Sequence, residues 1–455
     1  MKTYVSLLST VLMGAGILSV SLPAQADNLL GLYREAIRAD AAYLGAQADA
    51  QASREAKPQA LARLLPNMSF SGNRSKHSIT RPSFTDPFSG IHFTPPTEKY
   101  DTHTYALGLT QPVFRAGSIV AWKQSQAVVE GAEADLLWAE QQVGTRLSEA
   151  YFNVLLAEAN LEVTKAQRDA YLTHLDYAQK AFQTGAGTRT DIDEARSQLD
   201  LAAAHTIEQQ YQLNYASDEL KVFVDRPLAS LARLAPERIE LVSPDPGRFE
   251  YWVQKAEEAN PRLAALRASV EAASLQVRKA QSGHLPTVDF VAQQVRSEEL
   301  SFQANYQTSS KYKDKVYSLR FEMPIFSGGE TASQVRQARA ELDKNRQRLE
   351  EGRRQIGVMV RKEFDGVAQG VHWVHAYEQA VKSAEQALAS TRKGFMGGAR
   401  TTLDILTAEQ NLATAKRDLN RGRFDYVLSR LRLLSLVGEL NEAEIARFNG
   451  WLEEL

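Results

Sequence analysis

Two long stretches of the chain, residues 113–226 and 325–455, contain no proline. Proline inside a helix removes a hydrogen bond and clashes with the preceding turn, so both stretches can be helical throughout. Both are rich in Ala, Glu, Gln, Leu, Arg and Lys, which are strong helix formers. In the first, apolar residues recur at helical intervals at Leu136, Val143, Leu147, Ala150 and Val154. The pattern predicts two helical regions.

Glycines interrupt each helical region once, at 185–187 and at 397–398. The four glycines concerned, all expected to be left-handed helix caps, are Gly185, Gly187, Gly397 and Gly398. The interruptions predict helical hairpins over 118–225 and 330–438, each with one arm of about 65 residues and a shorter returning arm. The long arm would span roughly 100 Å, about three times the hydrocarbon core of a bilayer, and is expected to be a rod outside the membrane.

Alternation of apolar and polar residues marks the strand-like parts of the chain. It predicts four strands, at about 67–75, 104–112, 287–297 and 315–325. In the last, Tyr317 and Phe321 alternate with Arg320, which suits a sheet with one apolar face and one wet face. The segments 76–100 and 298–312 are polar or rich in proline and are expected to be loops.

The two halves of the chain follow one plan. The recurring pieces are Leu65-Pro66 with Leu285-Pro286, Gln111-Pro112-Val113-Phe114 with Met323-Pro324-Ile325-Phe326, and Phe182-Gln183-Thr184-Gly185 with Phe395-Met396-Gly397-Gly398. Their order and spacing indicate an internal duplication. The chain then divides into a first repeat (27–227), a linker (228–250), a second repeat (251–440) and a C-terminal segment (441–455).

Composition narrows the possible functions. The 53 Lys and Arg residues are balanced by 55 Asp and Glu residues, and the formal charge of −2 gives no attraction to nucleic acid. The chain has no cysteine, which excludes disulfides, thiolate metal sites, thiol nucleophiles and a lipid-anchored N-terminal cysteine. After the N-terminus no run reaches the roughly 18 apolar residues of a membrane helix, so any membrane span is expected to be β.

The first 26 residues have the pattern of a secretory signal peptide. Lys2 supplies positive charge, residues 5–22 are apolar and small, and Ala24-Gln25-Ala26 matches a cleavage site. The mature chain is expected to begin at Asp27. An uncleaved membrane anchor is the alternative, and the several serines and Pro23 argue against it.

Four strands are too few to cross a bilayer alone. A bilayer accepts helices or closed barrels, and about eight strands form the smallest usual barrel. Three copies of the chain would pool roughly twelve strands. The alternative from the residues alone is a soluble four-stranded sheet on a coiled-coil stalk.

Taken together, these features resemble the TolC family of outer-membrane efflux proteins over essentially the whole chain after residue 26. They are the signal peptide, the tandem repeat, Leu-Pro before the strands, Pro-Ile-Phe-Ser-Gly-Gly at 324–329, and a glycine six residues before an aspartate at each tip. The resemblance implies a mainly α fold with a membrane β-barrel: a homotrimer in outer-membrane lipid, with about 12 barrel strands, an α-helical tunnel across the periplasm and a collar built from 228–250 and 441–455.

The polar residues just after the tip glycines are the main candidates for a site. In the resembled family the matching positions close the periplasmic end of the tunnel, which implies a gate made by Thr190, Asp191, Arg400 and Asp404. Trimerisation would turn each aspartate into a ring of carboxylates that favours cations, and an arginine could hold the ring shut. The alternative is helix capping by Thr and Asp, which these positions suit equally well.

The chain departs from the family at two gate positions. Phe395 stands where the family has a tyrosine, and Thr407 stands where it has a second acid one turn beyond Asp404. Both departures predict a weaker or differently connected closed state. The resemblance further implies that a periplasmic adaptor docks on the tips around Gly185, Gly187, Gly397 and Gly398, since close helix-tip contacts need small residues.

Signals of an enzyme are weak. His372 and His375 are three apart on a helix with no carboxylate at a matching spacing, so they are interpreted as solvated surface residues. Ser327 before two glycines is interpreted as a helix start. We expect no catalytic residue, no cofactor, no metal and no nucleic-acid partner.

The resulting prediction is a passive export duct on which an adaptor and an inner-membrane transporter dock. Type I protein secretion with an ATP-binding-cassette (ABC) transporter and small-molecule efflux with a proton-driven pump compete, and the missing lipid-anchor cysteine favours secretion. An outlet shared by both stays open. The rival from another class is a periplasmic coiled-coil structural or adaptor protein. A hydrolase is a third option, for which no triad or metal set is assembled.

Overall fold

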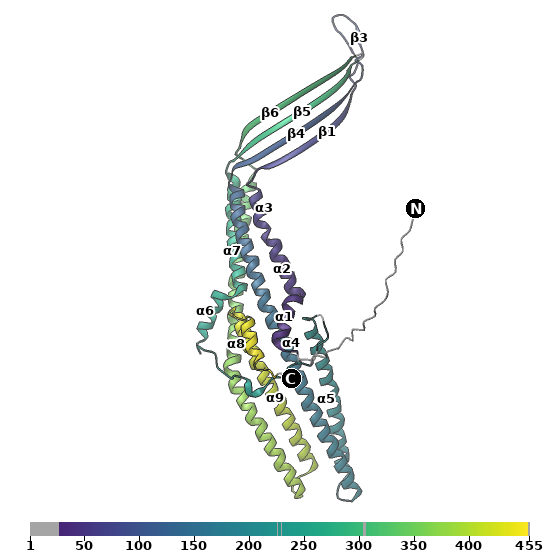
Figure 1. The fold of residues 1–455 in the computed structure, drawn as a ribbon, viewed down its shortest axis with the longest axis vertical. Helices are drawn as coiled ribbons and strands as arrows, with labels where there is room; N and C mark the ends of the chain where they lie inside the picture. Colours follow the sequence, from purple (N-terminus) through teal and green to yellow (C-terminus); the bar gives the residue numbers. More distant parts are fainter. Residues whose placement is uncertain (1–26, 225, 229, 304–305, 454–455) are drawn as a thin grey trace, which may run out of the picture.

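The computed structural model describes residues 27–224, 226–228, 230–303 and 306–453, so the predicted signal peptide lies outside the described residues. Two long helices run from the sheet to the opposite end of the molecule, and each turns back as a shorter helix (Figure 1). The two pairs are α4 (Ala116–Gln183) with α5 (Arg189–Lys221), and α8 (Glu330–Met396) with α9 (Thr402–Leu436). The mainly helical fold is as predicted.

Shorter helices pack beside the halves of α4 and α8 that lie nearer the sheet (Figure 1). They are α1 (Leu29–Ala39), α2 (Ala41–Arg54), α3 (Ala56–Ala62), α6 (Phe249–Ala259), α7 (Pro261–Gln281) and α10 (Glu442–Asn449). Local signals set their ends: Asp40 caps α2 by accepting from the backbone N–H of Tyr43 at 2.7 Å, and Asn260 caps α7 ahead of Pro261.

The four long strands form one antiparallel sheet in the order β1-β4-β5-β6. Their bounds are β1 (Asn67–Ile79), β4 (Glu98–Arg115), β5 (Thr287–Gln303) and β6 (Tyr306–Glu322). A small hairpin of β2 (Phe84–Thr85) and β3 (His92–Phe93) lies beyond the end of the sheet farthest from the helices (Figure 1). Each repeat supplies two strands, and β1 and β6 are the two edges.

The strands are longer than the sequence predicted, so the assignment of 76–100 and 298–312 to loops is wrong where strands continue into them. In β1 and β4, for example, Lys76 pairs with Asp101 and the next residue, His77, pairs with Tyr100. Polar residues on both faces erase the alternation although the backbone pairing continues. At its other end β6 stops at Glu322 and does not reach 325, and Pro324 has no N–H to continue it.

The main hydrophobic core lies in the middle of the molecule, where α1, α4 and α9 meet the segments that follow residues 228 and 441. Tyr151 is buried there and its hydroxyl donates to the carbonyl of Ala232 at 2.7 Å. The N–H of Ala235 donates to the carbonyl of Trp451 at 2.9 Å. Within the described ranges, no helix combines the length and apolar character that crossing a membrane requires.

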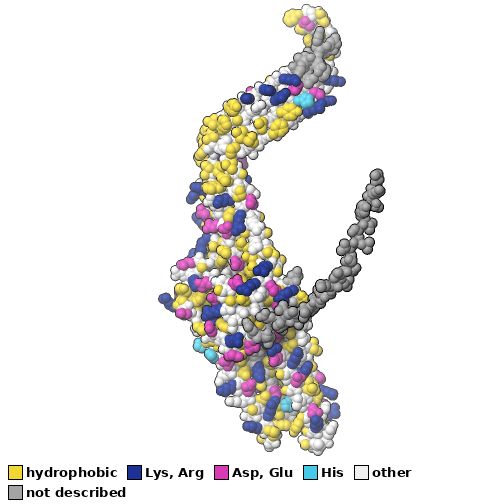
Figure 2. All heavy atoms as spheres, viewed as in Figure 1, with side chains coloured by type: hydrophobic (Ala, Val, Ile, Leu, Met, Phe, Trp, Pro, Cys, Tyr) yellow, Lys and Arg dark blue, Asp and Glu magenta, His cyan; other side chains and the backbone are white. Residues whose placement is uncertain are grey.

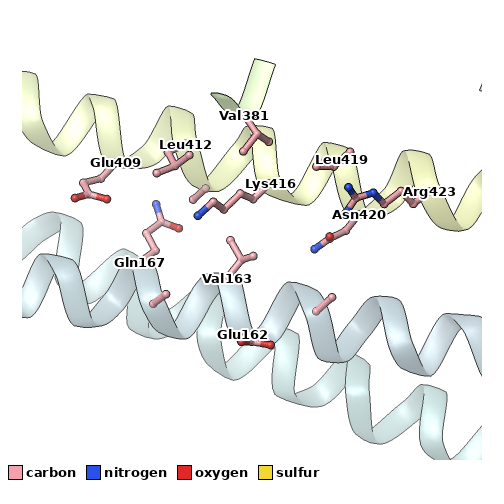
Figure 3. Close-up of a pocket in the computed structure, with 13 residues that line it drawn as sticks. Glu162, Val163, Gln167, Val381, Glu409, Leu412, Lys416, Leu419, Asn420 and Arg423 are labelled. Atoms are coloured by element: carbon pink, nitrogen blue, oxygen red, sulfur yellow. The ribbon is translucent and has the colours of Figure 1, made fainter. Parts of the chain in front are cut away.

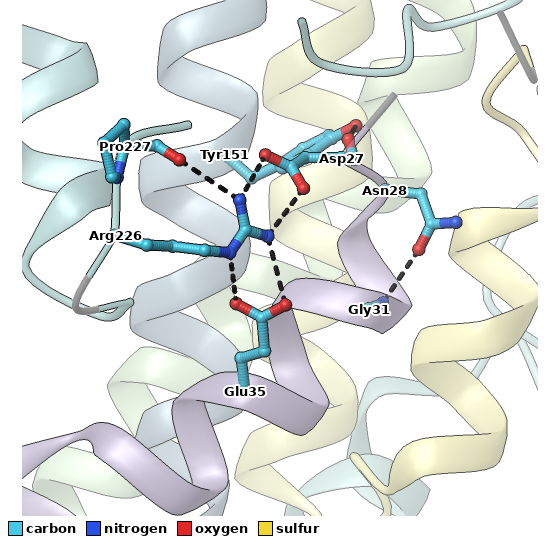
Figure 4. A network of polar contacts seen from close by, with 7 residues as sticks. All are labelled: Asp27, Asn28, Gly31, Glu35, Tyr151, Arg226 and Pro227. Atoms are coloured by element: carbon cyan, nitrogen blue, oxygen red, sulfur yellow. Dashed lines mark hydrogen bonds and ion pairs between the residues drawn. The ribbon is translucent and has the colours of Figure 1, made fainter. Parts of the chain in front are cut away.

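An arginine after α5 fixes the start of the described chain (Figure 4). Arg226 donates from Nη2 to Oδ1 of Asp27 at 2.6 Å and from Nε to Oε2 of Glu35 at 2.9 Å. The N–H of Asp27 also donates to the carbonyl of Ser230 at 2.9 Å. The hydrogen bonds to the two carboxylates raise the pKa of Arg226. This network ties α1 to the segment after the first hairpin.

Candidate functional site

The first hairpin tip is a tight turn between α4 and α5. Gly185 adopts φ +77°, and its N–H donates to the carbonyl of Phe182 at 3.1 Å. Helix α5 then begins with a capping box, in which Oδ2 of Asp191 accepts from the N–H and hydroxyl of Thr188 at 2.8 and 2.7 Å. In return Oγ1 of Thr188 accepts from the N–H of Asp191 at 3.2 Å. The capping box thereby satisfies two of the free N–H groups at the start of α5.

The second tip repeats this geometry between α8 and α9. Gly398 adopts φ +74°, and its N–H donates to the carbonyl of Phe395 at 3.0 Å. Oδ2 of Asp404 accepts from the N–H and hydroxyl of Thr401 at 2.8 and 3.0 Å, and Oγ1 of Thr401 accepts from the N–H of Asp404 at 3.2 Å. The duplication therefore extends to individual hydrogen bonds.

The expectation that all four tip glycines are left-handed holds for Gly185 and Gly398 and is wrong for Gly397 and Gly187. Gly397 has φ −85°, a conformation open to any residue. Gly187 is small for a different reason: a Cβ there would lie 3.0 Å from Cβ of Ala181 and close to the α4 backbone. Its role is to let the turn pack against the end of α4.

The four predicted gate residues lie on the two tips at one end of the molecule (Figure 1). Nη1 of Arg400 is 3.7 Å from Oδ1 of Asp404, and both side chains are partly exposed. Hydrogen bonds from Thr401 hold the pKa of Asp404 below its usual range. Among the described residues, no hydrogen bond or ion pair joins Thr190 or Asp191 to the second tip. Within one chain, Arg400 and Asp404 therefore lie together at the second tip. Thr190 and Asp191 of the first tip have no polar contact with them in the described residues.

Both aspartates are helix caps, the alternative that the sequence left open. Each uses Oδ2 for the cap. Oδ1 of Asp404 faces Arg400, whereas Oδ1 of Asp191 has no hydrogen-bond partner among the described residues. Capping therefore occupies half of each carboxylate and leaves the other oxygen available to a neighbouring chain or a cation.

The two positions that depart from the family have contacts of their own. The ring of Phe395 packs edge-on against Tyr177 of the first hairpin, with centroids 5.5 Å apart. The hydroxyl of Thr407 donates to the carbonyl of Leu403 at 2.9 Å within α9. Sequence reasoning missed Tyr177, because nothing in the local pattern of α4 shows which of its residues faces α8.

A second missed feature is a buried polar cluster where α4 meets α9. The hydroxyl of Tyr171 donates to the carbonyl of Leu406 at 3.4 Å, and Glu409, with a side chain 10% exposed, forms an ion pair with Arg392. Burial beside this pair lowers the pKa of His174 from its ordinary value, against the attraction of Glu409. Among the described residues, the hydrogen bond from Tyr171 to Leu406 is the polar contact between the two hairpins that lies nearest to the tips.

A groove of about 500 Å³ continues from this cluster along α4 and α9 toward the middle of the molecule (Figure 3). Lys416 and Arg423 of α9 line it, but their ion pairs at 3.3 and 2.8 Å are with Glu385 and Glu378 of α8. Glu162 of α4 lies on the other wall. Among its described lining residues no ion pair crosses the groove.

The chain is similar to known proteins over nearly all of its length. A family model described as "Outer membrane efflux protein" matches residues 32–224 and 252–439, one match in each repeat. The alkaline protease secretion protein AprF of Pseudomonas aeruginosa is 30% identical over 96% of this chain and 90% of its own length. The outer membrane protein TolC of Escherichia coli is 28% identical over 98% of this chain and 89% of its own length.

The fold is also that of a solved structure. The outer membrane protein VceC of Vibrio cholerae superposes with a TM-score of 0.73 at 21% sequence identity, over 90% of this chain and 96% of that one. At that identity the likeness establishes the architecture of long hairpins and a short sheet.

Proposed function

The chain belongs to the family of outer membrane efflux proteins, and from that premise we propose that it is the exit duct of a type I protein-secretion system. The membership itself establishes a TolC-type channel in the outer membrane with a helical tunnel in the periplasm. Such channels are passive conduits and not enzymes. The proposal concerns the cargo, the partners and the gate.

The likeness to a protease secretion protein carries the proposal. AprF matches both repeats and both hairpins over nearly the whole of each chain. The lack of a lipid-anchor cysteine supports the same choice. Under this proposal the partners are a periplasmic adaptor and an inner-membrane ABC transporter. Small-molecule efflux with a proton-driven pump is the second candidate, favoured by the family's own description.

The proposed assembly is a homotrimer. In one chain β1 and β6 are unpaired edges, and a sheet in a bilayer must pair all of its backbone groups. Joining three chains edge to edge, β6 of one against β1 of the next, would close the sheet. The same three-fold arrangement would place three copies of each hairpin tip around one axis.

The proposed gate is the ring made by these tips. Asp404 and Asp191 of three chains would form rings of carboxylates, and Arg400 would bridge to the neighbouring chain from its position beside Asp404. The tip glycines leave backbone exposed, where an adaptor could approach closely. Because both aspartates also cap helices, replacing them by Asn retains an oxygen for the cap while removing the charge.

The gate is tested by block of single channels with a trivalent cation. Asp404→Asn should weaken block about tenfold, since a loss of about 1.4 kcal/mol of attraction changes affinity by that factor. Asp193→Asn removes an exposed charge two residues after Asp191 and serves as the matched control. Equal block in both variants would exclude Asp404 from the constriction.

The cargo is tested in a strain that lacks the protein. The culture-supernatant proteome is compared with that of the parent, beside sensitivity to a panel of dyes, detergents and antibiotics. Loss of one or a few secreted proteins with unchanged drug tolerance is the expected result. Drug sensitisation with an intact secretome would instead establish small-molecule efflux.

A further inference from the structure

One face of the sheet is divided into two bands. In the half next to the helices, side chains that share this face in the strand register are mostly apolar, and several are exposed, with Phe70 72% and Tyr317 71% accessible. The members are Met68, Phe70, Tyr105, Leu107, Leu109, Phe290, Tyr317, Leu319 and Phe321. On β4 this band runs from Tyr105 to Phe114, with Gln111 as a polar member, and its length is close to the about nine to eleven residues that a tilted strand needs to cross a bilayer.

The same face becomes basic in the half farther from the helices, where Figure 2 shows Lys and Arg side chains gathered beyond the apolar surface. The cross-strand pairs continue the register of the apolar band, so these residues stand on its side of the sheet. The basic band consists of Arg74, Lys76, Lys99, Arg296, Lys311, Lys313 and Lys315. Asp101 and Glu298 are the acidic residues among them.

Most of the basic band is not neutralised within the chain. Arg74 lies 3.5 Å from Asp101, and Lys311 forms an ion pair with Glu298. Among the described residues the other five cations, which are Lys76, Lys99, Arg296, Lys313 and Lys315, form no ion pair. Arg296 and Lys313 are direct cross-strand partners, although like charges placed opposite each other destabilise a sheet. Such an arrangement favours an anion brought by a partner.

The opposite face has neither band. The residues that alternate with the apolar band on β1 and β4 are small, as in Ser69, Ser71, Ala106 and Gly108. Farther out, the residues that alternate with the basic band are mostly uncharged, such as Asn73, Ser75, Thr102 and Thr104. Excess positive charge is therefore confined to the face that also carries the exposed aromatics, which is the face that would meet lipid in a closed barrel.

We propose that the basic band is a binding surface for the phosphate groups of the anionic glycolipid in the outer leaflet. The helices are periplasmic, so the half of the sheet far from them lies toward the cell exterior. A band of cations directly beyond the apolar band is at the depth of the lipid headgroups. Continuity with the apolar band selects a membrane lipid over a soluble polyanion, because acyl chains and phosphates are then met by adjacent surfaces.

The test uses the purified full chain in phosphatidylcholine nanodiscs with lipid A carrying two phosphates as the probe. The variant is Arg296→Gln, Lys313→Gln and Lys315→Gln combined. The control, Lys165→Gln, Arg348→Gln and Lys382→Gln combined, removes three helical cations that form no ion pair in the described residues. Bound lipid A per trimer should fall at least about tenfold in the variant, since each basic residue near an anionic surface contributes about fivefold. The control should match the parent.

Two further arms identify the source of the phosphate. With the parent protein, dephosphorylated lipid A should bind at least about tenfold more weakly than the phosphorylated probe, and inorganic phosphate should not displace the probe. Equal binding of both lipids by the parent would overturn the proposal and leave apolar contact alone. Displacement by inorganic phosphate would show an anion site without lipid specificity and would also overturn it. These arms need no variant and remain decisive if the triple variant fails to fold.

Discussion

The two hairpin tips share a backbone and differ in what they present. Each turns at a glycine of positive φ and starts its returning helix with a Thr-Asp capping box of nearly the same distances. At the equivalent turn position the first tip has Gly187, where a Cβ would lie 3.0 Å from Cβ of Ala181, and the second has Arg400, paired with Asp404. Duplication retained the hydrogen bonds that close the turn, and divergence placed an arginine at this turn position in one of the two copies.

The difference has a local structural origin. At the first tip the turn packs so close to Ala181 and Phe182 that a Cβ at Gly187 would be crowded, with its nearest atoms at 3.0 to 3.2 Å. At the second tip the residue that corresponds to Ala181 is Gly394, and the stem of Arg400 lies over it. A Cβ at Gly394 would come within 2.8 Å of Cγ of Arg400. Gly394 therefore makes room for the arginine. At this turn position the first tip packs closely on α4, and the second carries an arginine that pairs with Asp404.

The largest effect is expected from filling the close contact. Gly187→Ala should destabilise the first tip by about 2 kcal/mol, because the new Cβ meets the backbone of α4. Hydrogen exchange of the amides at 185–188 should accelerate about thirtyfold. Gly397→Ala at the second tip is the matched control, since its nearest atoms are 3.6 Å away. Equal acceleration at both tips would contradict the asymmetry.

The next effect concerns the ionic contact. Arg400→Ser should raise the resting single-channel conductance about tenfold, if the arginine contributes about 1.4 kcal/mol to the closed state through charge-assisted bonds. Arg189→Ser removes an exposed arginine of the first tip, paired at 3.4 Å with Asp193, and should leave conductance unchanged. An unchanged conductance in Arg400→Ser would remove the arginine from the gate.

Local sequence patterns predicted the tips well and the contacts between the hairpins poorly. A glycine six residues before an aspartate is a local signal, and it located both turns and both capping boxes. The packing of Tyr177 on Phe395 and the ion pair of Arg392 with Glu409 depend on how helices distant in the chain approach each other. The crowding around Gly187 likewise cannot be predicted from the local sequence.

The sheet shows the same division. The apolar halves of the strands were predicted because exposed aromatics such as Tyr317 and Phe321 alternate with polar residues. The outer halves were not, because Lys76 and Lys99 lie on strands whose two faces are both polar. Hydrogen bonding across the sheet holds these residues extended, and that information lies in the partner strand.

A smaller effect tests whether the capping boxes are equivalent. Thr188→Ala and Thr401→Ala should each destabilise their helix start by about 1 kcal/mol, which corresponds to about fivefold faster exchange of the first-turn amides. The two values should agree, because the cap distances agree. Thr→Ser at each position retains the hydroxyl and is the control. A cost at one tip alone would show that the boxes have diverged.

The smallest effect is expected at the polar cluster between the hairpins. Burial lowers the pKa of His174, so its neutral form is favoured in the folded contact. The stability it contributes is present above the ordinary histidine pKa of about 6.5 and is lost as the pH falls through the lower folded value. Exchange of the amides at 171–178, corrected for its intrinsic pH dependence, should therefore rise about twofold more in acid for the parent than for His174→Gln.

A second variant tests the charges around this histidine. Glu409 attracts and Arg392 repels the added proton, so Arg392→Gln should raise the His174 pKa and shift the transition to higher pH. A parent and His174→Gln with the same corrected profile would show that the hairpins separate without titrating this histidine.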